Sequence, residues 1–326
     1  MACRTLKLLQ SHVNSNDWTT AQQLIGDLKE MGRILKQADP SETVPSNMVL
    51  RSLKIIRDEV LRISLGLSDL PDADHAGVEI MQSIDPEKDL DYSKSLTGLK
   101  ESVQGFMEEW EAEIEVSAEN IAKEGLQHVS EDEVILTLGS SKTVESFLRK
   151  AAIQRSFQVI VAEGAPFCHG HDMAMTLANS NIRTTVIPDS AIFTVLSRVT
   201  KVIIGTHSVT ANGGLKGVSG AYGLALAAKQ HAVPLIVLAA MFKYTPEYLV
   251  SHDQSAFNKI VSPSSVLPIH RRDLVDRVDV INPVFDYVPP ELITVLIAGE
   301  KEGHAPSYVY HKLSTLYHRD DYLVTN

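Results

Sequence analysis

The chain has 326 residues, of which 44% are hydrophobic and 22% are charged, a globular composition with room for about two domains. The formal net charge of −11 argues against a dedicated nucleic-acid-binding protein, whose surface would carry a basic patch. Two cysteines, Cys3 and Cys168, form no disulfide framework and indicate a reducing compartment, and no leader or membrane-spanning run of about 18 apolar residues is recognisable. We therefore expect a soluble cytosolic protein with no direct contact to membranes or nucleic acid.

Between residue 17 and about residue 127, apolar side chains recur with the spacing of amphipathic helices. Asp17 is placed to cap the first of three helices. The expected apolar faces are Ala21, Leu24, Leu28, Met31 and Leu35; then Leu53, Ile56, Val60 and Ile63; then Leu96, Leu99, Val103, Phe106, Trp110 and Ile114. The segment 68–93 contains two Pro and many Asp, which predicts an acidic, solvated connection.

From about residue 130, short apolar runs alternate with helical windows. Strands are expected at 134–138, 158–162, 184–187, 201–204, 234–238 and 278–281, and helices at 143–155, 170–180, 190–197 and 218–231. Apolar strands separated by helices indicate a parallel sheet covered on both faces, with right-handed crossovers. The predicted fold class is α/β: a helical N-terminal domain at 1–128, then a Rossmann-like doubly wound, mostly parallel sheet domain at 129–326.

A ligand site in such a sheet lies at the carboxyl ends of the strands. The loops expected at that edge are 139–141, 163–169, 188–189 and 205–217. Backbone N–H groups at Gly139 and Ser140 are placed to bind a phosphate. However, the glycine fingerprint of a dinucleotide-binding dehydrogenase is absent, so a tight turn that caps the next helix is the simpler interpretation.

Two further loops leave alternatives open. The run Cys168–Asp172 suggests a metal site or a thiolate nucleophile, but no second ligand group stands at the usual zinc spacing. A plain helix start, with Asp172 favoured by the helix dipole, is the simpler interpretation. We expect no metal and no cofactor. The small residues at 205–214, including Asn212, Gly213 and Gly214, allow positive φ and close backbone approach. That pattern favours a ligand or interface loop as much as a plain tight connection.

At this loop the sequence resembles a known family. The run Val202–Gly214 is similar to the V-I-I-G-T…A-N-G segment of the regulatory subunits of eukaryotic translation initiation factor 2B. The resemblance extends over nearly the whole chain. Its other segments are 40–43, 47–49, 53–57, 161–168, 170–171, 227–229, 234–237 and 241–243, together with 283–294 and 305–308, which resemble the beta branch of that family.

The resemblance also brings in sugar-phosphate isomerases that share the family's fold. Those enzymes use a catalytic Cys after a strand and an Asp in a G-A-D loop. In this sequence the Cys position falls at or beside Gly139, and the Asp position falls at His207. Because isomerisation needs a positioned acid and base, the resemblance implies a vestigial pocket without catalysis. Its expected residues are Gly139, Ser140, His207, Asn212, Gly213 and Gly214. An active isomerase is the alternative, and a dehydrogenase is a third reading.

The resemblance implies a non-catalytic regulatory role. The implied partners are alpha, gamma, delta and epsilon subunits of a guanine-nucleotide exchange complex, with initiation factor 2 as substrate and phosphorylation of its alpha subunit as the sensed signal. Strand-start residues are expected to face a delta-like subunit. These interface candidates are Asp132, Val134, Gln158, Ile160, Thr185 and Ile187; the alternative is that the apolar ones belong to the sheet core.

Overall fold

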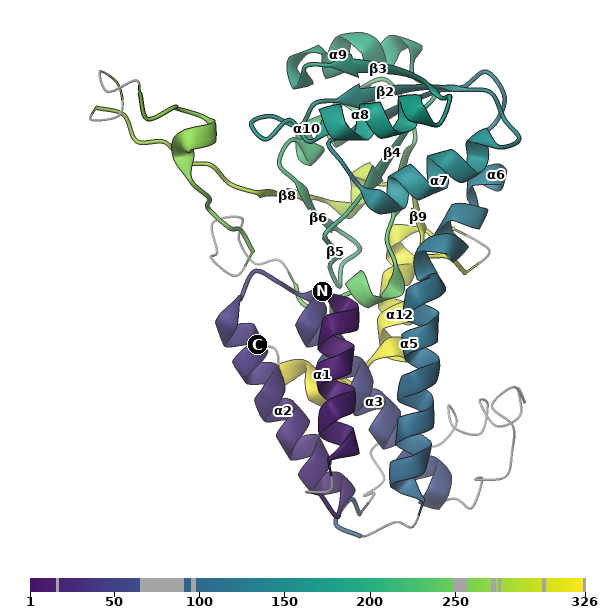
Figure 1. Ribbon diagram of the computed structural model, residues 1–326, viewed down its shortest axis with the longest axis vertical. Helices are drawn as coiled ribbons and strands as arrows, with labels where there is room; N and C mark the ends of the chain where they lie inside the picture. The colour runs from purple at the N-terminus through teal and green to yellow at the C-terminus, as the bar shows by residue number, and fades with distance from the viewer. Residues whose placement is uncertain are drawn as a thin grey trace. The chain divides into compact units, whose positions relative to one another are not determined.

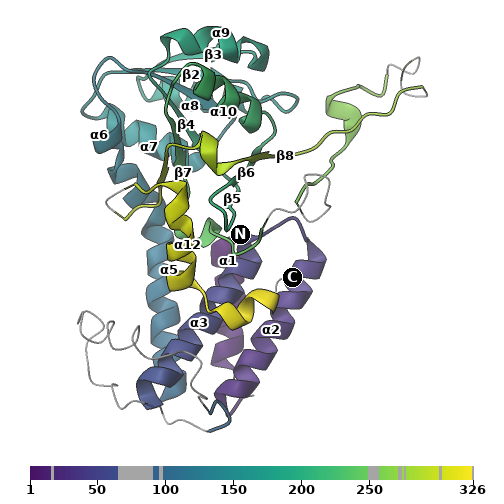
Figure 2. The same cartoon turned by 180° about the vertical axis from the view of Figure 1, so that it is seen from behind.

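The computed structural model describes residues 1–15, 18–64, 91–94, 98–248, 257–270, 274, 277–300 and 303–324. The chain divides into two compact units (Figures 1 and 2). The helical unit contains residues 1–38, 45–113 and 316–326, and the α/β unit contains residues 39–44 and 114–315. The domain boundary expected at residues 128 and 129 stays a prediction.

The helical unit is built from amphipathic helices. They are α1 (Ala2–Asn14), α2 (Ala21–Ala38), α3 (Val44–Ser64) and the first part of α5 (Leu99–Lys123). Most of the core positions expected on α2 and α3 are buried, including Leu24, Leu28, Leu53 and Ile56, because apolar residues three or four apart share one helix face. The expected positions Met31, Leu35 and Ile63 are only partly buried. Helix α1 lies upstream of the predicted periodic region. Asp17, Leu96 and the segment 68–90 lie outside the described residues.

The last turn of the chain is fixed to this unit by a buried ion cluster. Asp321 belongs to the 3-10 helix η7 (Arg319–Val324), and its side chain is fully buried. Arg57 of α3 donates two hydrogen bonds of 2.8 Å to its two carboxylate oxygens. Lys29 of α2 lies 2.9 Å from Oδ1. Burial by itself would raise the pKa of Asp321, but the two cations outweigh it and hold the pKa below its usual value.

The α/β unit contains the predicted parallel sheet. Its strands are β1 (Val134–Leu138), β2 (Gln158–Ala162), β3 (Arg183–Ile187), β4 (Lys201–Gly205), β7 (Leu235–Leu238) and β9 (Val295–Ile297), in the order β3-β2-β1-β4-β7-β9. Every pair of neighbours is parallel. The connecting helices are α7 (Lys142–Ala152), α8 (Gly170–Asn179), α9 (Ile192–Val195) and α10 (Ala221–Gln230). The predicted fold class is therefore confirmed.

The sixth strand is not where the sequence pattern placed it. The run 278–281 forms no strand, and Val278 and Ile281 are exposed. The edge beside β7 is taken by β9, where Val295 pairs with Ile236. Apolar alternation alone cannot tell an exposed ribbon from an edge strand, and the three residues of β9 are too few to give a periodic signal.

A second, antiparallel sheet was not predicted. It has the order β5-β6-β8, formed by β5 (Ser208–Val209), β6 (Leu215–Val218) and β8 (Phe285–Val288). Val218 therefore ends a strand instead of beginning a helix. Helix α10 starts only at Ala221, after Gly220 with φ +95°, because a left-handed residue cannot continue a strand or a helix.

One face of the parallel sheet is covered by α7 and α8. Ile135, Val159 and Val161 share a buried cluster with Phe147 of α7 and Leu177 of α8, and Figure 1 shows these two helices beside the sheet. Side chains of neighbouring strand residues alternate between the two faces. The residues on either side of these three, such as Leu136 and Ile160, therefore point to the opposite face.

Candidate functional site

The turns at the carboxyl ends of β1, β2 and β4 are packed against one another. Gly139 has φ +60°, and a Cβ built on Gly164 would lie 3.2 Å from its Cα. Ser141 caps α7 by accepting a hydrogen bond from the N–H of Val144. A Cβ on Gly205 would lie 2.5 Å from the Ser141 Oγ. Close approach of the turns therefore requires glycine at 205 and, together with a φ of +72°, favours it at 164. Gly139 is favoured by its positive φ alone, and it supplies no reactive side chain.

The loop after β2 is held by a carboxylate from the loop after β3. Asp189 accepts hydrogen bonds of 2.9 Å from the N–H of Gly164 and 2.7 Å from the N–H of Ala165. Cys168 in this loop is half-buried and has φ +55°. Within the described ranges, no group of three or more His, Cys, Asp or Glu residues is placed to hold a metal ion.

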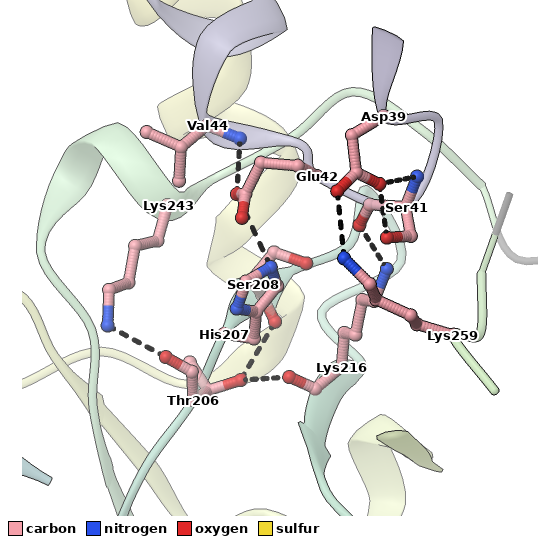
Figure 3. Close-up of polar contacts among 10 residues, drawn as sticks. All are labelled: Asp39, Ser41, Glu42, Val44, Thr206, His207, Ser208, Lys216, Lys243 and Lys259. Atoms are coloured by element: carbon pink, nitrogen blue, oxygen red, sulfur yellow. Dashed lines mark hydrogen bonds and ion pairs between the residues drawn. The ribbon is translucent and has the colours of Figure 1, made fainter. Parts of the chain in front are cut away.

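His207 lies next to a carboxylate that the sequence pattern did not reveal. Its Nε2 is 3.3 Å from Oε1 of Glu42, which also accepts a hydrogen bond from the Val44 N–H (Figure 3). Burial opposes ionisation of Glu42, but His207, the Val44 N–H and nearby Lys216 together lower the pKa of this carboxyl. The other face of the imidazole packs on Phe285, with 4.7 Å between the ring centres.

Three lysines surround the same segment, residues 39–44. Lys216 is 2% exposed and donates to the backbone carbonyl of Ser41. Lys259 donates to Asp39 Oδ2 at 3.2 Å. Lys243 donates to the Thr206 carbonyl at 2.8 Å, and burial lowers its pKa although Glu42 opposes the shift (Figure 3). The contacts of Lys216 and Lys259 with this segment join residues 175 and 220 positions apart, so no local sequence signal could have found them.

Two buried hydroxyl groups in or near this segment, Thr43 Oγ1 and Ser208 Oγ, lack a hydrogen-bond partner among the described residues. Thr43 and Ser208 are 3% and 0% exposed, respectively. Buried hydroxyls of this kind are usually satisfied by ordered water or by a polar ligand. The segment 39–44 and the start of the β5–β6 hairpin thus bring several buried polar groups together in the α/β unit.

Asn212, Gly213 and Gly214 form the tip of the β5–β6 hairpin, while His207 lies at its base. The Asn212 amide oxygen accepts from the Gly214 N–H at 3.0 Å, and its Nδ2 donates to the Tyr287 hydroxyl at 2.7 Å. A Cβ on Gly213 would lie 2.4 Å from the Pro306 carbonyl oxygen. The tip is therefore a turn held by its own packing, and the exposed Ser140 lies in the separate turn after β1.

Five of the six interface candidates share one face of the sheet. The register pairs Val134 with Gln158, Leu136 with Ile160, Ile160 with Thr185, and Ala162 with Ile187, so these alternating positions point the same way. Gln158 and Thr185 are exposed, whereas Ile160 and Ile187 are each only 8% exposed. Asp132 precedes β1, has φ +57°, and donates its N–H to the Ser156 carbonyl.

Comparisons with known proteins agree on one family. Residues 1–300 match the model of the "Initiation factor 2 subunit family". "Translation initiation factor eIF2B subunit beta" of Dictyostelium discoideum is 37% identical, over 97% of this chain and 90% of the relative. The ribose 1,5-bisphosphate isomerase of Pyrococcus furiosus is 30% identical, but over 65% of each chain.

Two solved structures share the fold over nearly the whole chain. The crystal structure of eIF2B beta from Chaetomium thermophilum superposes with a TM-score of 0.73 and 28% identity, covering 98% of this chain and 87% of that one. The tetrameric eIF2B-beta2-delta2 complex of the same organism gives a TM-score of 0.70 and 26% identity, covering 97% of this chain and 88% of that one.

Of the helices within the described ranges, none combines the length and apolar character that a bilayer crossing requires.

Proposed function

This chain belongs to the initiation factor 2 subunit family, and from that membership we propose that it acts as a regulatory, non-catalytic subunit of a guanine-nucleotide exchange complex of the initiation factor 2B type. The observation that carries the proposal is the extent of the similarity. It covers 97% of the chain and 90% of the beta-subunit relative, so it includes both the helical unit and the α/β unit.

The proposed partners follow from the relatives. The Chaetomium thermophilum complex contains beta and delta subunits, and we extend that pairing to this chain. The sheet face that carries Val134, Gln158, Ile160, Thr185 and Ile187 is the proposed contact surface. Alpha, gamma and epsilon subunits would complete the complex in the cytosol. Initiation factor 2 would be its substrate, and phosphorylation of that factor's alpha subunit would be the signal it senses.

Loss of isomerase chemistry is part of the proposal. The position at which the related isomerases would carry a catalytic Cys falls at or beside Gly139, which has φ +60° and brings no side chain to the sheet edge. We take His207, which lies beside Glu42, to stand at the position of the isomerases' Asp. A His–carboxylate pair can move a proton, but it lacks the second group that an isomerisation needs.

Purification of the complex from its native cytosol, followed by mass measurement of the intact assembly, tests the subunit role. We expect this chain to elute with delta-type and other family subunits, and a chain that runs only as a monomer or as a self-dimer would contradict the proposal. Turnover of methylthioribose 1-phosphate or ribose 1,5-bisphosphate by the purified chain would instead establish the isomerase alternative.

Acidic helices offer a second test of partner choice. Glu101, Glu108 and Glu109 are exposed on α5 within the helical unit. We propose that such residues help to select a basic face of the substrate. Reversing these charges should weaken binding of initiation factor 2 and flatten its salt dependence, because exposed charge pairs are screened by salt. Unchanged affinity and unchanged salt dependence would refute this idea.

A further inference from the structure

The tip of the β5–β6 hairpin contains a chemically reactive pair of residues. Asn212 is followed by Gly213, and this is the only Asn-Gly pair in the sequence. At such a pair the backbone nitrogen of the glycine can attack the side-chain amide carbon of the asparagine, because glycine has no Cβ to obstruct the approach. Asn212 is exposed, so water can reach its side chain. The pair is therefore a candidate site of spontaneous deamidation.

Deamidation proceeds through a cyclic imide. The Gly213 nitrogen loses its proton and forms a bond to Asn212 Cγ, while the bond from Cγ to Nδ2 breaks and ammonia leaves. Water then opens the imide at either carbonyl, which leaves an aspartate or an isoaspartate at this position, and nothing is oxidised or reduced. The rate therefore depends on the attacking nitrogen, on the amide oxygen and on the leaving nitrogen.

Each of these atoms has a hydrogen-bond partner in the folded tip. Oδ1 of Asn212 accepts from the Gly214 N–H at 3.0 Å and from the Thr210 hydroxyl at 2.6 Å. Since a backbone N–H can only donate, the contact with Gly214 also fixes which way the amide faces. Nδ2 donates to the Tyr287 hydroxyl at 2.7 Å. The Gly213 N–H donates to the Thr210 carbonyl at 2.8 Å.

These contacts have opposite effects on the reaction. The donors on Oδ1 would stabilise the negative charge that this oxygen gains during the attack. However, attack requires loss of the Gly213 proton, and a deprotonated nitrogen would face the Thr210 carbonyl oxygen, which disfavours that charged form. Cγ must also turn towards the Gly213 nitrogen, whereas Oδ1 is held on the nitrogen of Gly214. Because the nucleophile must form and approach before the donors can act, we expect the folded tip to suppress the reaction.

The contact at Nδ2 comes from a different strand. Tyr287 belongs to β8, and the register pairs it with Lys216 of β6. Its ring fits closely against the hairpin because residue 214 is glycine: a Cβ there would lie 2.5 Å from Tyr287 Cε2. Gly213 is also confined, since its Cβ would lie 2.4 Å from the Pro306 carbonyl oxygen. Pairing of β6 with β8 therefore brings Tyr287 to the asparagine amide.

We propose that Asn212 is a deamidation site gated by the three-stranded sheet, unreactive while β8 pairs with β6 and open to attack when Tyr287 leaves the tip. An isoaspartate adds a methylene group to the backbone of a turn that packs closely on Pro306, so the tip of a modified chain closes poorly. The site thus records, irreversibly, that a chain has opened this sheet. This inference does not depend on the proposed function.

The test follows deamidation of the full chain by peptide mapping with mass spectrometry, during incubation at physiological pH and temperature. The wild type is compared with Tyr287→Phe, which removes only the hydroxyl that holds Nδ2. The matched control is Tyr222→Phe, because Tyr222 is 43% exposed on α10. Asn179, which is exposed at the end of α8 and followed by Ser180, is the internal reference. The wild-type chain in concentrated urea gives the rate at Asn212 without the fold.

We expect Asn212 to react roughly tenfold or more slowly in the folded wild type than in urea, because several hydrogen bonds must break first. Tyr287→Phe should accelerate the reaction about threefold or more, with Tyr222→Phe within about twofold of the wild type, because one of those bonds is lost. Equal rates in the folded and unfolded wild type would overturn the proposal, and so would equal rates in the two variants. If Tyr287→Phe accelerated Asn179 as much as Asn212, general loss of structure would be the cause and the proposal would be wrong.

Discussion

Removing the charge of Asp321 should destabilise the helical unit strongly. The carboxylate is fully buried and accepts two hydrogen bonds from Arg57, with Lys29 at 2.9 Å. An Asp321→Asn substitution leaves two cations facing a neutral amide that cannot accept the paired bonds. Breaking a buried ion pair from one side typically costs about 3–5 kcal/mol. The expected loss is therefore a large part of the stability of a small helical unit.

Tryptophan fluorescence isolates this effect, because Trp18 and Trp110 are the only tryptophans of the chain and both belong to the helical unit. Urea unfolding followed by this signal should show a large drop in the midpoint for Asp321→Asn. The matched control is Glu30→Gln, which removes an exposed ion pair and should cost less than about 0.5 kcal/mol. A loss for Asp321→Asn no larger than that of the control would refute the reasoning.

The pH dependence gives an independent check on the same residue. The folded pKa of Asp321 is lowered, so its ionised form contributes stability that is fully present above the unfolded value of about 3.9 and is lost as the pH falls through the folded value. The stability difference between the wild type and Asp321→Asn should therefore be constant near neutral pH and shrink on acidification below about pH 4. A difference that stayed constant down to pH 2 would contradict this linkage.

Three further changes test the α/β unit. Gly213→Ala should lower the free energy of unfolding by about 2–4 kcal/mol, because its φ is +81° and its Cβ would meet a backbone oxygen. The control Gly223→Ala, on the open face of α10, should be neutral or slightly stabilising. Thermal unfolding of the two variants distinguishes these outcomes. Asp189→Ala should speed hydrogen exchange of residues 163–171, and an unchanged exchange pattern would contradict its role in holding the loop. Glu42→Gln should lower the free energy of unfolding by about 1.5 kcal/mol at pH 7. Because the pKa of Glu42 is lowered in the folded protein, this stability difference from the wild type should disappear in acid. A stability difference that persisted at pH 3 would count against the contact with His207.

The parallel sheet could be predicted from the sequence because its strands are buried on both sides. Runs such as 134–138 and 158–162 are continuous apolar segments between helical windows, and the structure places β1 and β2 at those bounds. The strand expected at 278–281 was wrong, because Val278 and Ile281 face solvent and no neighbouring strand within the described residues covers them. The spacing of apolar residues shows which side chains could be buried, but it does not show which other elements cover them.

The polar surroundings of the candidate site could not be predicted. Glu42 reaches His207, and Lys216 reaches the Ser41 carbonyl, across most of the chain. Neither residue type is unusual in its local context, so the contacts follow only from the folded path of the backbone. In contrast, glycine at 139 and 213 was marked by composition, and both have positive φ. A position with positive φ is indicated locally by its glycine, whereas an ion pair between distant residues has no local sequence pattern.

The division of the chain has a practical consequence for dissecting it. Residues 39–44 belong to the α/β unit although both flanking segments belong to the helical unit, and the final eleven residues return to the helical unit. The polypeptide is thus interleaved, and no single cut separates two intact pieces. A fragment ending before residue 316 would lack Asp321, and a fragment starting after residue 44 would lack Glu42. Either fragment expressed alone would therefore lack a charged residue of its own unit. A low stability measured for that fragment would reflect the missing residue and not the intrinsic stability of the unit.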